Sequence, residues 1–209
     1  MNRKQHWETA YKKIGSTAVS WYRPHLETSL RLIVEAAHKD ERIIDIGGGA
    51  STLVDDLINS EFSSIAVLDI SPSAIQTARL RLGSKADNVQ WLESDIARPA
   101  AIPAQYYNVW HDRAVFHFLT DHQDRQHYIE NVRRSVIPGG TVIVATFAID
   151  GPTRCSGLEV DRYDPKTLHH EFGDYFELME SIHEIHKTPS GVSQSFVYCR
   201  CTMRALSTV

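Results

Sequence analysis

The regular alternation of short apolar segments with longer amphipathic ones limits the possible folds of this chain more than any other feature of its sequence. Segments rich in Val, Ile and Leu are typical of buried strands. Five such segments lie in the middle of the chain: Arg42–Ile46, Ile65–Leu68, Val89–Leu92, Tyr106–Trp110 and Thr141–Phe147. Helical patterns lie between them at 51–59, 71–82 and 121–136. Because strands joined through helices pair in parallel with right-handed connections, the pattern predicts a parallel sheet with helices on both faces.

The two ends of the chain have different patterns. The expected elements there are helices at 3–14, 25–38 and 165–172 and strands at 176–185 and 195–205. A turn-forming stretch at 188–191 joins the last two strands, which predicts a hairpin. We therefore predict an α/β fold: a seven-stranded, mostly parallel sheet with helices on both faces and a C-terminal antiparallel hairpin strand.

The composition is ordinary for a globular protein, with 42% hydrophobic and 23% charged residues among 209. A formal charge of -4 argues against a dedicated nucleic-acid binder, which usually presents a basic face. The sequence shows neither a membrane span nor a signal peptide, so we expect a cytoplasmic monomer or small homo-oligomer. The three cysteines are too few for a disulfide framework and lack zinc-finger spacing, so no metal is expected.

The strongest local signal is a glycine turn after the first of these strands, Asp45-Ile46-Gly47-Gly48-Gly49-Ala50-Ser51. Glycine lets the backbone turn tightly and lets a ligand approach the main chain closely. The helix that follows offers free N–H groups to a carboxylate or a phosphate. We expect this turn to bind a ligand, and a Gly47→Val variant to fold without binding it.

Two acidic residues follow the next two strands. Asp69 comes 20 residues after Gly49, where an acid can bind both hydroxyls of a ribose. Asp95 follows the third strand. Each acid taken alone is equally well explained as a helix cap or a turn residue. Because ligands of open α/β sheets bind at the carboxyl ends of the strands, both acids and the glycine turn converge on one crevice.

Together, Asp45-x-Gly47-x-Gly49, Asp69 and Asp95-Ile96 resemble the motif series of class I S-adenosylmethionine-dependent methyltransferases, over roughly residues 40–148. The resemblance implies a Rossmann-like fold and S-adenosylmethionine as the cofactor. It also implies that the glycine turn lines the methionine part, Asp69 binds the ribose and Asp95 binds the adenine amino group. A nicotinamide dehydrogenase matches less well, since its third glycine would fall at Thr52. The full set of expected cofactor-binding residues is Asp45, Gly47, Gly48, Gly49, Ser51, Asp69, Ile70, Asp95, Ile96, His111 and Trp21.

In this family the segment that begins at His111-Asp112-Arg113 faces both the sulfonium and the acceptor. It differs from the Asp/Asn-Pro-Pro-aromatic tetrad of enzymes that methylate nucleic-acid bases, so no DNA or RNA substrate is expected. An acceptor that must lose a proton needs a general base, and Asp112, His111 and His117 are the candidates. Asp112 is preferred because it is closer to the strand end than His117. The alternatives are that Asp112 orients its neighbours and that His117 is a packing residue.

Substrate contacts are expected from Arg113, Arg154 and Tyr22. Arg154 lies in the loop 150–158 after the fifth strand, where a long loop can form a substrate-binding wall. Trp21 and Tyr22 are expected either to cover the cofactor as a lid or to attach the N-terminal segment to the core. The whole of 1–209 is then one methyltransferase domain, divided into a helical lid segment at 1–38, a cofactor-binding core at 40–148, and the substrate loop and C-terminal strands at 149–209.

The sequence leaves the methyl acceptor open. A compact chain without a large accessory domain favours a small molecule that accepts the methyl group on N, O or S. The Asp112 segment and the opening His6-Trp7-Glu8-x-x-Tyr11 resemble a group of protein-lysine methyltransferases that modify elongation factors, so a protein lysine is the alternative acceptor. In the Asp-Lys-Gly segment of that group, however, this chain has Arg113 and Ala114 in place of Lys and Gly. A third possibility is a protein that binds the cofactor without catalysis.

Overall fold

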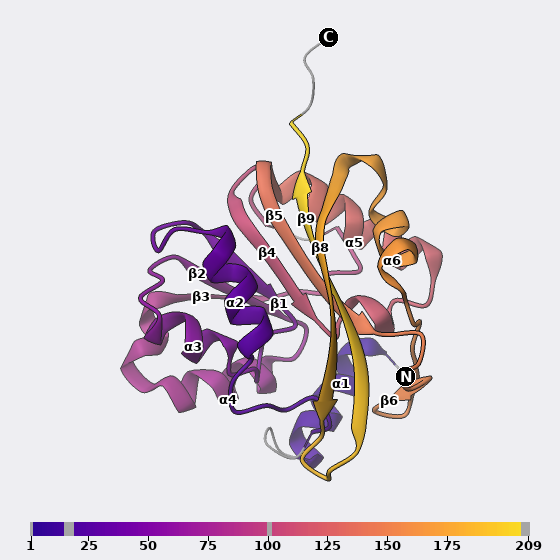
Figure 1. Ribbon diagram of the computed structural model, residues 1–209. Coiled ribbons are helices and arrows are strands. Elements are labelled where there is room, and N and C mark those ends of the chain that lie inside the picture. Colours follow the sequence, from indigo (N-terminus) through magenta and orange to yellow (C-terminus); the bar gives the residue numbers. More distant parts are fainter. Residues whose placement is uncertain (1, 15–18, 100–101, 206–209) are drawn as a thin grey trace.

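A seven-stranded sheet forms the centre of the protein (Figure 1). The structure is a computed structural model, and it describes residues 2–14, 19–99 and 102–205. The strand order is β3-β2-β1-β4-β5-β9-β8. The strands are β1 (Ile43–Ile46), β2 (Ile65–Asp69), β3 (Val89–Glu93), β4 (Tyr107–Arg113), β5 (Val136–Phe147), β8 (Phe176–Lys187) and β9 (Ser193–Met203). The first five pair in parallel, and β9 is antiparallel to both of its neighbours. This confirms the predicted fold.

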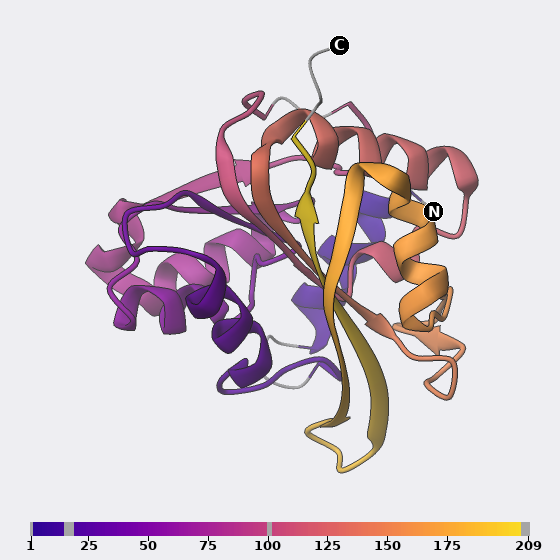
Figure 2. The same cartoon turned by 45° about the horizontal axis from the view of Figure 1, so that its top comes forward.

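Helices cover both faces of the sheet (Figures 1 and 2). They are α1 (Arg3–Ile14), α2 (Glu27–Ala36), α3 (Leu53–Asn59), α4 (Pro72–Leu82), α5 (His122–Ser135) and α6 (Pro165–Phe172). One hydrophobic cluster includes residues of α5 and α6, and a second includes residues of α2 and α3. Successive residues of a strand point to opposite faces, so Ile44 belongs to the first cluster and Ile43 to the second. Every residue of β1 and β2 is buried, as the continuous apolar runs predict.

Local signals fix where α4 begins. The Ser71 hydroxyl accepts a hydrogen bond from the Ala74 amide, and Pro72 occupies the first turn, as expected from the Ser71-Pro72 pair. The short strands β6 (Arg154–Cys155) and β7 (Leu158–Glu159) form a small hairpin after β5. Within the residues placed by the structure, no helix is both long enough and apolar enough to span a membrane.

β4 is longer than the sequence pattern predicts, and this difference shapes the site. The expected strand ends at Trp110, but β4 continues to Arg113 because it pairs with β1 on one side and β5 on the other. These ladders bring the polar residues His111 and Asp112 into the strand. Side chains alternate along a strand, so His111 and Arg113 point to one face of the sheet and Asp112 to the other.

Candidate active site

Two adjoining cavities lie at the carboxyl ends of the parallel strands. The first contains about 670 Å³ of space and the second about 480 Å³, open solvent included. The cavities share Tyr11, Trp21, Ile46, Gly47 and Arg113 as lining residues. The shared lining residues place the two cavities side by side, and we treat them together as one site.

Most of the residues expected from the sequence line this site. In addition to the shared residues, those on the first cavity are Asp69, Ile70, Asp95 and Ile96. Those on the second are Asp45, Gly48, Ser51, His111 and Tyr22. Four expected residues line neither cavity: Gly49, Asp112, His117 and Arg154.

The glycine turn is needed by the protein's own packing. Gly47 has a φ of +68°, in the left-handed region that favours glycine, and a Cβ there would lie 2.1 Å from Val115 Cγ2. A Cβ on Gly48 would lie 2.2 Å from Asp45 Oδ2, and one on Gly49 would lie 2.6 Å from an oxygen of Asp69. The expectation that a Gly47→Val variant folds normally is therefore wrong, because the added side chain collides with Val115 before any ligand binds.

Asp69 is a buried carboxylate on the wall of the first cavity. Its Oδ2 accepts a hydrogen bond from the Gly49 amide at 3.0 Å, and its Oδ1 accepts one from the Ser71 amide at 2.8 Å. Burial raises the pKa of Asp69 to about 6, although these backbone hydrogen bonds act in the opposite direction. The carboxylate thus links the glycine turn to the start of α4.

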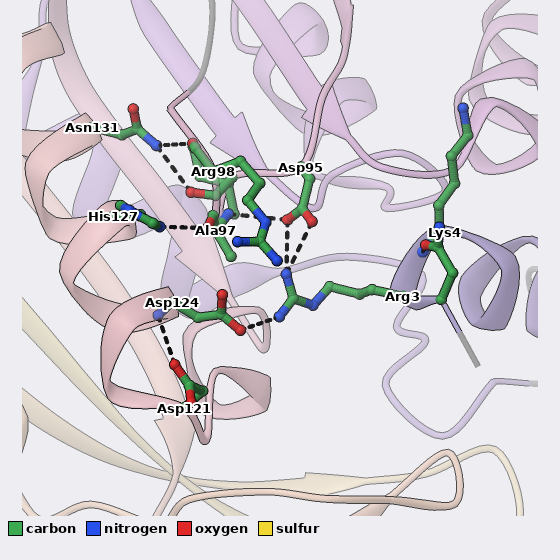
Figure 3. Close-up of polar contacts among 11 residues, drawn as sticks. Arg3, Lys4, Asp95, Ala97, Arg98, Asp121, Asp124, His127 and Asn131 are labelled. Carbon is green, nitrogen blue, oxygen red and sulfur yellow. Dashed lines mark hydrogen bonds and ion pairs between the residues drawn. The ribbon is translucent and has the colours of Figure 1, made fainter.

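Asp95 lies after β3 and is held from two directions (Figure 3). Its Oδ1 accepts a hydrogen bond from the Ala97 amide at 3.0 Å. Arg3 Nη1 lies 3.1 Å from Oδ1 and 3.0 Å from Oδ2. Arg3 Nη2 donates to Asp124 in the first turn of α5. The Arg3 guanidinium therefore links α1 to Asp95, which lines the first cavity, and to Asp124 on α5.

α1 forms a roof over the first cavity. Arg3, Trp7 and Tyr11 line the cavity, and their spacing of four residues places them on one face of the helix. Phe118, which follows β4, lines the same cavity. None of these four was among the residues expected to form the site. The sequence signals for the roof are the helical spacing of the first three and the opening His6-Trp7-Glu8-x-x-Tyr11, which contains two of them.

Glu8 fastens this roof to the first turn of α4. Its carboxylate accepts hydrogen bonds from Ser71 Oγ at 2.5 Å, from the Ser73 amide at 2.9 Å and from Ser73 Oγ at 2.7 Å. Burial would raise the pKa of Glu8, but the hydrogen bonds together outweigh it and lower the pKa to about 2. In addition, an ion pair between Lys4 and Glu93 ties α1 to the end of β3.

Asp45 and His111 form a buried pair on the wall of the second cavity. His111 Nδ1 lies 2.7 Å from Asp45 Oδ1, and the two residues are only 1% and 2% exposed. His111 Nε2 and Asp45 Oδ2 have no hydrogen-bond partner among the described residues. In the tautomer of His111 that donates from Nδ1 to Asp45, the lone pair of Nε2 is left available.

Arg113 places a buried cation between the two cavities. Its Nε donates to Tyr198 Oη at 2.9 Å and its Nη1 donates to the Trp21 carbonyl at 3.2 Å. Its Nη2 has no hydrogen-bond partner in the described structure, and Glu184 Oε1 lies 3.8 Å away. The guanidinium also lies 4.5 Å from the ring centre of Phe196. Nε and Nη1 therefore make hydrogen bonds and the guanidinium packs on an aromatic ring, whereas Nη2 makes no hydrogen bond with the described residues.

Asp112 lies on the opposite face of β4, away from the cavities. Its Oδ1 accepts a hydrogen bond from the Val115 amide at 2.8 Å. Its Oδ2 accepts hydrogen bonds from the Phe116 amide at 3.1 Å and from Tyr128 Oη at 2.7 Å. Burial raises the pKa of Asp112 to about 7. These contacts are those of a residue that orients the turn after β4, the alternative considered for Asp112.

His117 and Arg154 are also outside the site. His117 is fully buried against Phe147, and its Nδ1 accepts a hydrogen bond from the Phe147 amide at 3.1 Å. Burial lowers the pKa of His117 to about 3, so the ring is neutral at physiological pH. Arg154 is exposed and donates to the Gly157 carbonyl within its own hairpin. Of the three expected general bases, His111 alone lines a cavity.

Comparison with known proteins agrees with this geometry. Residues 44–142 match the family model of a methyltransferase domain. The chain is 28% identical over 123 residues to the mouse eEF1A lysine and N-terminal methyltransferase, a match that covers 57% of this chain and 17% of that protein. It is 22% identical over 200 residues to the mouse EEF1A lysine methyltransferase 2, covering 87% of this chain and 75% of that protein.

The fold is shared with solved methyltransferase structures. The N-methyltransferase NodS from Bradyrhizobium japonicum, in complex with S-adenosyl-L-homocysteine, superposes with a TM-score of 0.67 at 16% identity, over 86% of this chain and 85% of that one. The sequence match, the strand order and the acidic and glycine-lined edge of the sheet agree with one another. Residues 44–142 are therefore similar to a methyltransferase domain, and the chain shares the Rossmann-like fold of solved methyltransferases.

Proposed function

We propose that this chain transfers a methyl group from S-adenosylmethionine to an amine nitrogen, and that the cofactor lies along both cavities. The observation that carries the proposal is a pair of charged atoms on the second cavity that make no hydrogen bond. Asp45 Oδ2 is a buried acceptor without a donor, and Arg113 Nη2 is a buried donor whose ion-pair partner, Glu184 Oε1, lies 3.8 Å away, beyond hydrogen-bond distance. Buried polar groups normally have partners, so both atoms point to a ligand. An α-ammonium and an α-carboxylate supply the two missing partners.

The first cavity fits the adenosine end of the same cofactor. Asp69 offers carboxylate oxygens to ribose hydroxyls, and Asp95 offers them to an exocyclic amine. Ile70 and Ile96 supply apolar surface beside them. The residues shared by both cavities would then lie around the centre of the ligand. This arrangement supports the roles that the family resemblance implies for Asp69 and Asp95.

When bound, S-adenosylmethionine supplies an electrophilic methyl group on a sulfonium sulfur. An amine attacks only through a free lone pair, so an ammonium must first lose a proton. His111 Nε2 is the free base on the site wall, and Asp45 holds the imidazole in place through Nδ1. We assign the proton to His111, directly or through one water molecule. The site would also position the reactants relative to each other.

A protein lysine is the acceptor that the comparisons favour. Both mouse relatives are lysine methyltransferases by name, and one of them matches 87% of this chain. The small-molecule acceptor expected from the compact chain stays a prediction. The two differ in where the methyl group is found, so one labelling experiment separates them.

The test uses S-adenosylmethionine with a tritiated methyl group and host-cell extract divided into dialysed protein and small molecules. We expect label in the protein fraction, recovered as methylated lysine after hydrolysis. Label only in small amines would retain N-methylation and reject the lysine. Label on oxygen or sulfur alone, or no transfer by a chain that binds the cofactor, would contradict the proposed reaction. Arg154→Ala is the matched control, because Arg154 is exposed and lines neither cavity.

A further inference from the structure

Four aromatic side chains from three separate segments meet on the first cavity. We call this set the aromatic wall: Trp7, Tyr11, Trp21 and Phe118. Trp7 and Tyr11 come from α1, Trp21 comes from the segment before α2, and Phe118 comes from the short helix Phe116–Phe118 after β4. Tyr11 and Trp21 also line the second cavity. The aromatic wall therefore lies where the two cavities meet.

The rings stand nearly at right angles to one another. Trp7 and Trp21 have ring centres 5.8 Å apart and an interplanar angle of 83°. The corresponding values are 4.8 Å and 80° for Trp7 and Phe118, and 6.1 Å and 84° for Tyr11 and Trp21. Perpendicular rings form adjoining walls, as in aromatic cages for quaternary ammonium groups. The face of each ring carries negative potential and attracts a cation.

Of the two arginines on the same cavity, Arg3 is paired with Asp95 and Asp124, and Arg113 lies 3.8 Å from the carboxylate of Glu184. The carboxylate of Asp69 lies on the same cavity. A further positive group at this place is therefore balanced by a nearby carboxylate and by the ring faces.

We infer that the aromatic wall binds an onium cation, either the sulfonium of the cofactor or the ammonium of the acceptor. The inference rests on the proposed function, which places the reacting centre at the junction of the cavities. Its consequence is that the cationic ligand binds more tightly than its neutral counterpart. Packing of α1 onto the core would require the same apolar rings, but it would not distinguish charged from neutral ligands.

The first arm of the test measures S-adenosylmethionine and S-adenosylhomocysteine by calorimetry, since only the former carries a sulfonium. The proteins are the wild type, Trp7→Phe, Trp7→Leu, Trp21→Phe and Trp21→Leu. For a sulfonium on the wall, affinity for S-adenosylmethionine should fall from Trp through Phe to Leu, by about 5- to 30-fold overall. Affinity for S-adenosylhomocysteine should change by less than about 2-fold. Trp91→Leu is the control, since Trp91 lines neither cavity.

The second arm asks whether the cation is an ammonium. Choline and its neutral isostere 3,3-dimethylbutanol are titrated into the chain, both alone and loaded with S-adenosylhomocysteine. Preference for choline that is lost in the Leu variants would assign the wall to the acceptor. The Phe variants keep an apolar ring in each place, so they test the order of affinities even where a Leu variant fails to fold.

Equal losses for S-adenosylmethionine and S-adenosylhomocysteine, together with no preference for choline, would overturn the inference and leave the rings as packing residues. A wild-type chain that binds neither cofactor form would instead overturn the proposed function. The difference in affinity between choline and 3,3-dimethylbutanol would then still show by itself whether the aromatic wall binds a cation.

Discussion

The attachment of α1 through Glu8 allows a quantitative prediction. The three hydrogen bonds to the Glu8 carboxylate come from Ser71 and Ser73, at the start of α4. Glu8→Gln keeps the shape of the side chain but removes its charge and one of its acceptor oxygens. A hydrogen bond to a charged group contributes roughly 1.5–3 kcal/mol and a neutral one about 1 kcal/mol. We expect the substitution to weaken the docking of α1 by about 1–2 kcal/mol.

Hydrogen exchange measures this docking directly, because α1 can open without unfolding of the sheet. A loss of 1–2 kcal/mol corresponds to about 5- to 30-fold faster exchange of the α1 amides. Exchange in α5 should stay unchanged. Glu27→Gln is the matched control, since Glu27 is 66% exposed and pairs with Arg23 away from α1. Unchanged α1 exchange in Glu8→Gln would refute the view that this carboxylate holds the roof.

The pH dependence of the same contact has a defined sign. The pKa of Glu8 is about 2 in the folded chain, below its ordinary value of 4.5. A lowered folded-state pKa contributes stability that is complete above about pH 4.5 and is lost as the pH falls towards 2. Protection of α1 should therefore decrease over this range in the wild type, and much less in Glu8→Gln. Parallel loss in both proteins would assign the effect to other groups.

Three further predictions concern the site and its supports. Arg113→Met should weaken S-adenosylmethionine binding by about 10- to 100-fold, which corresponds to the free energy of one hydrogen bond to a charged group. Methylthioadenosine, which lacks the amino-acid end, should bind nearly as before, and equal losses in calorimetry would contradict the role given to Arg113. Asp112→Ala should lower the free energy of unfolding in urea by about 2–4 kcal/mol, because two backbone amides, one of them buried, and the buried Tyr128 hydroxyl lose their acceptor. Wild-type stability with lost turnover would return Asp112 to the catalytic role. His111→Ala should reduce kcat by about 10²- to 10⁴-fold with little change in cofactor affinity. Near wild-type kcat would leave positioning as the mechanism.

The fold could be predicted because its strands are buried on both faces. β1 and β2 are apolar except for Asp45 and Asp69, so their composition and length identified them without tertiary information. The end of β4 was missed since His111, Asp112 and Arg113 have no strand-like pattern. Pairing with β1 and β5 extends the strand through them, and such long-range pairing is not encoded locally.

The site was partly predictable for a similar reason. Asp45, Asp69 and Asp95 lie at or just after strands, so the topology alone places them at one edge of the sheet. Strand parity separates His111 from Asp112, and it could be assigned only once β4 was known to reach Arg113. Trp7 reaches the site by packing against Phe118, a contact between distant parts of the chain that no local pattern reveals.

Because α1 forms its roof, the site is built from two parts of the chain. Asp45, Asp69 and Asp95 lie within residues 44–142, the part that matches the methyltransferase domain. Trp7 and Trp21 come before that part and line the same site. Exchanging the segment before β1 between related proteins would then replace the roof formed by α1 and leave the acidic residues at the edge of the sheet unchanged. Such chimaeras would be expected to keep their methyl donor and to change which molecule receives the methyl group.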